Sequence, residues 1–70
     1  MAEYETAIEN FTTAIELDPY YENHYLWRGY AYRRLDNREQ AIADFEQVLA
    51  LTDDDETKAD VEGLLTQLKQ

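Results

Sequence analysis

The chain has 70 residues, no cysteine, and 16 acidic against 6 basic side chains, which gives a formal net charge of -10. A chain of this length buries only about 60% of its unfolded surface, so we expect one small, soluble domain without a deep enzymatic pocket. The absence of cysteine excludes disulfides, thiolate zinc sites and thiol nucleophiles. The hydrophobic content of 44% is too high for a disordered acidic chain. The negative charge argues against nucleic acid and membrane as partners.

Apolar residues recur at helical spacing along the whole chain. In the first segment they fall at steps of four, three and four, at Tyr4, Ile8, Phe11 and Ile15. No segment alternates apolar and polar residues as a half-buried strand does. The sequence therefore predicts an all-α fold with four helices, at about 2–18, 21–35, 38–51 and 55–69.

Three short signals separate the predicted helices. Pro19 ends the first helix, because proline cannot donate a backbone hydrogen bond and disfavours helical geometry in the residue before it. Asp36 and Asn37 are the residue types that best tolerate a left-handed turn when glycine is absent. The acidic run 53–56 suits the start of the last helix, where carboxylates cap free backbone N–H groups.

The sequence repeats itself at an offset of 34 residues. Residues 7–21 then lie over residues 41–55, and every apolar position of the helix is matched. The same offset places Gly29 over Gly63, two of the only three glycine or proline residues in the chain. A glycine inside a helix costs about 1 kcal/mol relative to alanine, so we expect both glycines to mark close helix packing.

This spacing resembles the tetratricopeptide repeat, a 34-residue helix–turn–helix family. The matching motif is Tyr25-x2-Arg28-Gly29-x2-Tyr32 followed by Ala41-x3-Phe45. The resemblance implies an antiparallel helix–turn–helix repeat, a fragment of an α-solenoid. Within the single domain 1–70, it implies the second helix of a partial repeat at 1–21, a complete repeat at 22–55 and a C-terminal capping helix at 56–70.

Basic residues gather in one band, where residues 23–38 carry four arginines against a single acid. These arginines either neutralise neighbouring acids or hold an anionic partner, and the sequence leaves both readings open. One of them, Arg28, stands where the tetratricopeptide motif has leucine, so it places a charge at a position that the family packs with an apolar side chain.

Catalytic and metal-binding patterns are missing from the sequence. His24 has no serine or cysteine nucleophile at a recognisable spacing. The acidic run 53–56 lacks the alternating ligands, glycine and closing glutamate of a calcium loop. We therefore expect no enzyme, no metal site and no cofactor.

The tetratricopeptide resemblance implies a concave groove lined by the first helix of each repeat. Helical geometry by itself places Leu26, Tyr30 and Arg33 on one stripe. An ordinary helix face with two isolated apolar residues is the alternative interpretation. The predicted groove residues are Asn23, Leu26, Tyr30, Arg33 and, at the edge, Arg34, together with Leu64 on the last helix.

We expect the chain to be a non-catalytic protein–protein interaction module that binds a peptide or a partner helix in this groove. The arginines predict a partner with an acidic group beside an apolar one. The alternative is a structural, self-associating fragment, or a designed or truncated piece of a longer array, because repeat proteins usually need about three units for stability.

Self-association is predicted at the first helix, whose apolar stripe has one side without a companion helix. The residues assigned to this contact are Tyr4, Ile8 and Phe11. The simplest product is a two-fold homodimer, formed in one version by exchange of helices between chains. The sequence shows no secretory signal core and no cysteine, which favours a cytoplasmic location.

Overall fold

The computed structural model describes residues 2–70, with side chains from residue 3 onward, and consists of four α-helices. They are α1 (Ala2–Leu17), α2 (Glu22–Arg34), α3 (Arg38–Leu51) and α4 (Asp55–Leu68). No strand occurs among the described residues. The predicted all-α fold is confirmed, and each observed helix boundary lies within one residue of the predicted one.

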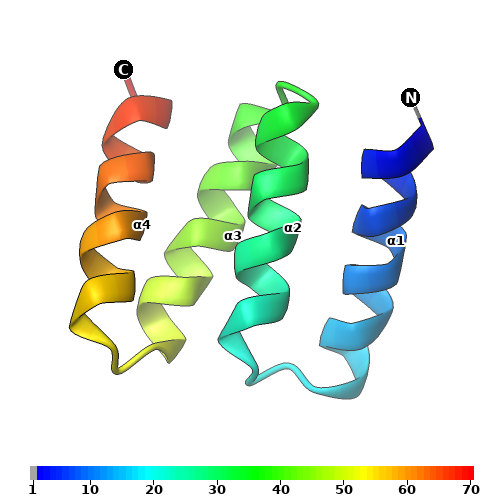
Figure 1. Cartoon of the computed structure of the whole chain (residues 1–70), viewed down its shortest axis with the longest axis horizontal. Helices are drawn as coiled ribbons and strands as arrows, with labels where there is room; N and C mark the ends of the chain where they lie inside the picture. Colours follow the sequence, from blue (N-terminus) through cyan, green and yellow to red (C-terminus); the bar gives the residue numbers. More distant parts are fainter. Residues whose placement is uncertain (1) are drawn as a thin grey trace.

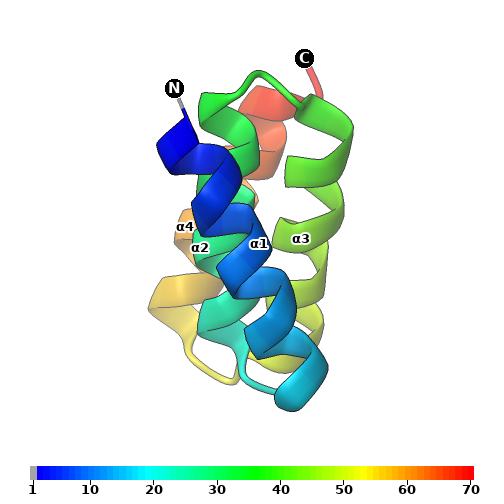
Figure 2. The same ribbon diagram turned by 90° about the vertical axis from the view of Figure 1, so that its right-hand side faces the viewer.

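Consecutive helices run antiparallel and lie side by side in a single row (Figure 1). Among the described residues, the backbones approach most closely between α1 and α2, between α2 and α3, and between α3 and α4. The row forms a slab of 31 × 29 × 15 Å. A view along it shows α1 in front, α2 and α4 behind it and α3 displaced to one side, so the row is staggered (Figure 2). The predicted helix–turn–helix solenoid fragment is therefore present, with α1 at one end and α4 at the other.

Side-chain caps begin the last two helices. The Asn37 side chain accepts a hydrogen bond from the Gln40 backbone N–H at 3.5 Å and so caps α3. Asp54 accepts hydrogen bonds from the Thr57 hydroxyl at 2.6 Å and from the Thr57 backbone N–H at 3.1 Å, and caps α4. These hydrogen bonds lower the pKa of Asp54 because they favour the ionised carboxylate, and the bond from the Thr57 hydroxyl has the largest effect.

The predicted left-handed turn is also confirmed. Asp36 has a φ of 61°, the positive-φ region that aspartate and asparagine enter more easily than most residues. The turn needs only three residues between α2 and α3, which brings the two helices together as antiparallel neighbours.

The hydrophobic core lies between α2, α3 and α4. Its central cluster of buried residues comes from α3 and α4 and consists of Ala41, Phe45, Val48, Val61 and Leu65. Ala31 of α2 is buried as well, outside this cluster. Half-buried side chains of α2 cover this cluster, namely Tyr25, Leu26, Tyr30 and Tyr32. In contrast, no side chain from residue 3 to residue 17 is fully buried, so α1 packs on the row from one side only.

The two glycines of the 34-residue repeat have different surroundings. A Cβ atom at Gly29 would lie 2.7 Å from Cε1 of Phe45, so the absence of a side chain lets α2 approach the ring closely. A Cβ atom added at Gly63 would have no neighbour within 4 Å in the described part of the chain. The expectation that both glycines mark close packing is therefore correct for Gly29 and wrong for Gly63, because none of the described helices packs against that side of α4.

Candidate functional site

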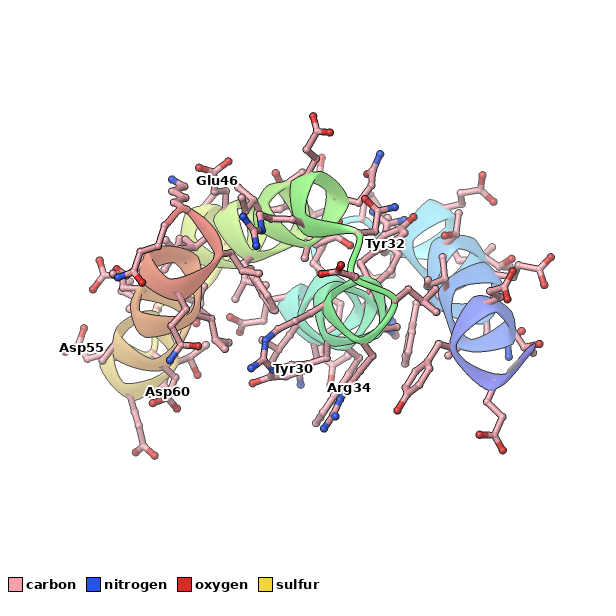
Figure 3. The ribbon with its side chains drawn as sticks, turned by 90° about the horizontal axis from the view of Figure 1, so that it is seen from above. Tyr30, Tyr32, Arg34, Glu46, Asp55 and Asp60 are labelled. Carbon is pink, nitrogen blue, oxygen red and sulfur yellow. The ribbon has the colours of Figure 1, made fainter. Side chains whose placement is uncertain are left out.

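A pocket of about 350 Å³ opens between α1 and α2. Its lining is mostly apolar and consists of Tyr4, Ala7 and Phe11 from α1 with Trp27, Tyr30, Ala31 and Arg34 from α2. Seen from above, Tyr30 and Arg34 point to the same side of the row, whereas Tyr32 lies on the opposite side of α2 (Figure 3). The pocket is large enough to hold one or two bulky side chains of a bound partner.

Helical spacing explains both walls of this pocket. Trp27, Tyr30 and Arg34 follow one another at steps of three and four, so they share one face of α2. The facing residues of α1 obey the same spacing. A hollow remains between the walls because the residues between the aromatic rings are small, Ala7 on α1 and Ala31 on α2.

Aromatic rings give the pocket a fixed floor and an exposed rim. The ring of Tyr30 lies edge-on against the buried Phe45, with centroids 5.5 Å apart and an interplanar angle of 72°. Trp27 lies beside Tyr30, with centroids 5.6 Å apart, and is 52% exposed. Tyr4 on the facing helix is 40% exposed. Such half-exposed aromatic side chains are available for contact with a second molecule.

Two arginines border the pocket at the C-terminal end of α2. Arg33 and Arg34 are exposed and line a second, polar hollow of about 330 Å³. Among the described residues, neither has a carboxylate within 4 Å, although the chain carries 16 acids. Their charge complements the negative end of the α2 dipole, and it remains available to an anionic group from outside.

The predicted groove residues do not all lie at this pocket. Only Tyr30 and Arg34 line it, and Arg33 lies next to it. Asn23 donates a hydrogen bond to the Tyr21 hydroxyl at 3.0 Å. Leu26 and Leu64 are half-buried and pack against the core cluster.

The residues predicted for self-association fall largely in the same pocket. Tyr4 and Phe11 line its α1 wall, and Ile8 is half-buried elsewhere on that helix. The sequence assigned these residues and the groove residues to separate sites, and it did not assign Trp27 to any. The signal for Trp27 was its spacing of three from Tyr30 on the same helix.

Arg28 forms a junction between three helices. Its Nε and Nη2 donate to the two carboxylate oxygens of Asp44 on α3, at 2.8 and 2.7 Å. Its Nη1 donates to Thr12 Oγ1 on α1 at 3.1 Å. The hydrogen bond to Asp44 raises the pKa of Arg28 further above its usual range. The charge that replaces leucine in the sequence motif is thus fully partnered, and we assign it a structural role.

Catalytic groups do not gather at the pocket. His24 lies edge-on against the Tyr21 ring, with centroids 4.7 Å apart. Among the described residues, no three histidine, aspartate or glutamate side chains lie close enough together to hold a metal ion. None of the described helices has the length and apolar character needed to cross a membrane.

The sequence matches the model of the family described as Regulator of microtubule dynamics protein 1-3, over residues 1–69. No curated protein and no solved structure was found to match the chain. The family match shows that the predicted membership of the tetratricopeptide repeat family is wrong. The motif misled because small and aromatic residues at this spacing satisfy the packing of many antiparallel helix pairs, so they predict the architecture without fixing the family. Because the match spans almost the entire chain, the protein belongs to the family of Regulator of microtubule dynamics protein 1-3.

Proposed function

We propose that this chain is a non-catalytic protein-interaction module that binds a helix or peptide of a partner protein over the pocket between α1 and α2. The observation that carries the proposal is the apolar pocket with an exposed aromatic rim, beside two arginines that have no acidic partner among the described residues. Tryptophan, tyrosine and arginine are the residue types enriched at the energetic centres of protein interfaces.

The pocket sets the chemistry of the partner. An apolar side chain fits between the aromatic walls, and a carboxylate can accept hydrogen bonds from Arg33 or Arg34 at the edge. The remainder of the chain is strongly acidic and repels anions. An acidic group of the partner is therefore favoured only where it lies next to Arg33 or Arg34. The two requirements together describe a segment with an apolar anchor followed by aspartate or glutamate.

The family description gives a biological setting for this module. The family's name refers to regulation of microtubule dynamics, and microtubules are polymers of protein, so a protein-binding surface suits such a role. We propose that the pocket supplies one such contact. Co-sedimentation with polymerised tubulin tests this role: retention of the wild-type chain and loss of the Trp27→Ala variant support it, whereas equal behaviour of the two contradicts it.

Peptide titration tests the binding site directly. Trp27 is the only tryptophan in the chain and lies in the pocket wall, so its fluorescence reports occupancy. We expect helical peptides with a Leu or Phe anchor followed by glutamates to bind, and matched peptides with lysines in place of the glutamates to bind at least about tenfold more weakly.

Two charge reversals provide the variant and its control. Arg34→Glu removes a pocket residue and should abolish the preference for acidic peptides. Arg38→Glu makes the same charge change at the start of α3, at a residue that lines neither hollow, and should leave binding unchanged. Equal binding by the wild type and both variants would show that the peptide does not use this site.

A further inference from the structure

The offset of 34 residues relates the first two helices of the row to the last two. It places α1 on α3 and α2 on α4, with Phe11 on Phe45 and Gly29 on Gly63. In the second half, the α3–α4 pair is covered by α2. In the first half, the equivalent α1–α2 pair has no such cover within the described residues.

The pocket is the uncovered equivalent of the hydrophobic core. Ala7, Phe11 and Ala31 line the pocket, and their partners at the 34-residue offset are Ala41, Phe45 and Leu65. Ala41 and Phe45 are 0% exposed because side chains of α2 pack over them, whereas Ala7 and Phe11 are only half-buried. Ala31 and Leu65 do not differ in this way, since they are 5% and 6% exposed. The α3–α4 pair is covered by α2. The α1–α2 pair has no described helix in the equivalent position, which leaves the pocket open.

The helix equivalent to α2 is α4, and its outward side is free. The close approach of α2 to α3 depends on Gly29, where a Cβ atom would lie 2.7 Å from the Phe45 ring. Gly63 is the matching glycine of α4, and within the described chain nothing lies within 4 Å of the Cβ position there. α4 thus has the same gap between its side chains, where a phenylalanine ring could pack. α4 and α1, which carries Phe11, lie at opposite ends of the row (Figure 1).

We propose that α4 of one copy docks in the α1–α2 pocket of a second copy, with Gly63 over the ring of Phe11, so that copies associate head to tail. This inference rests on the proposed function, in which the pocket receives a helix, and it names that helix.

Polar residues at the two surfaces agree with this docking. In the second half, Arg28 of α2 pairs with Asp44 of α3. The equivalent residues at the proposed contact are Glu62 and Asn10, both exposed, and an asparagine amide can donate to a glutamate carboxylate. An aspartate in the place of Asn10 would instead repel Glu62.

Net charge weakens the proposed contact. α4 carries Asp55, Glu56, Asp60 and Glu62 against a single lysine. α1, on which it would pack, carries four glutamates and no basic residue. Because salt screens the repulsion between the two helices, association should strengthen as ionic strength rises.

The contact should be weak. At the positions equivalent to Tyr25 and Tyr32 of α2, α4 has the smaller Ala59 and Thr66, so less apolar surface is buried. We expect association over a concentration series from about 10 μM to 1 mM, measured by sedimentation equilibrium. Because the two surfaces differ and lie at opposite ends, the product is an open series of dimers, trimers and longer chains, not a closed two-fold dimer.

Gly63→Leu separates association from folding. The position is open within the chain, so the variant should fold, but its side chain would fill the gap for Phe11 and weaken association at least about tenfold. Ala50→Leu adds a leucine at an exposed position of α3, away from both ends, and should associate like the wild type. Unchanged association of Gly63→Leu overturns the proposal, and so does a wild-type chain that is monomeric throughout the series.

Mixing two blocked variants tests the head-to-tail geometry. Trp27→Glu disrupts the pocket but leaves α4 intact, whereas Gly63→Leu does the reverse. Each variant alone should be monomeric, and their mixture should form a one-to-one dimer and nothing larger. Failure to form this dimer overturns the docking. If the wild type is monomeric but still binds acidic helical peptides in the Trp27 assay, this inference fails while the proposed function stands.

Discussion

Substituting alanine at each of the two glycines gives opposite effects on stability. Alanine gains about 1 kcal/mol over glycine in a helix interior. At Gly63 the new methyl group meets no described atom within 4 Å, so the full gain is expected. With roughly 4–8 °C in melting temperature for each kcal/mol in a domain of this size, the Gly63→Ala variant should melt about 4–8 °C higher.

At Gly29 the same methyl group lies 2.7 Å from Cε1 and 3.0 Å from Cδ1 of Phe45. That ring is 0% exposed and part of the core, so it has little room to move. Overpacking of a core typically costs about 1–3 kcal/mol. After the helix gain is subtracted, the Gly29→Ala variant should be less stable than the wild type by up to about 2 kcal/mol.

Urea unfolding followed by circular dichroism at low protein concentration measures both variants without interference from association. The informative quantity is the difference between the two free-energy changes, because the helix propensity is common to both and cancels. We expect that difference to be about 1–3 kcal/mol. If both variants are stabilised equally, the α2–α3 approach at Gly29 is not as close as the structure shows.

Three further results are expected. Asp44→Ala leaves the Arg28 guanidinium, whose side chain is 18% exposed, without its carboxylate, and should cost about 2–4 kcal/mol in urea unfolding, whereas adding Arg28→Leu should recover most of this loss. The lowered pKa of Asp54 means that its cap stabilises the fold above the unfolded pKa of about 3.9 and loses this effect as pH falls through the folded pKa. Asp54→Ala should therefore lower the melting temperature at neutral pH and have no effect in strong acid. Moderate salt should raise the melting temperature of the wild type by screening the repulsion among 16 acids, and a steady fall would show that attractive ion pairs dominate.

The helices could be predicted from the sequence because each boundary depends on residues close to it. Pro19, Asp36 and Asp54 act on their own turn or the next one, so local chemistry was enough. Arg28 was different: the sequence showed a charge at a packing position, and its partner Asp44 is 16 residues away on another helix. Only the tertiary structure reveals that this charge is neutralised.

The site could be predicted only in part. Periodicity identifies which residues share a face of one helix, but it does not fix how two helices are rotated against each other. Tyr4 and Phe11 were therefore assigned to one surface and Tyr30 and Arg34 to another, although all four line one pocket. The hollow also depends on Ala7 and Ala31, whose small size carries no recognisable signal in the sequence.

The arrangement of the helices in a single row has a consequence for folding kinetics. Because close backbone approaches between the described helices join neighbours in sequence, most native contacts close short loops, and low contact order favours rapid folding. Structure should nucleate at α2 and α3, where Phe45 and Ala41 are buried, and then extend outward. α1, with no fully buried side chain from residue 3 to residue 17, should detach first, so its backbone amides should exchange with solvent faster than those of α3 while the remaining helices stay packed.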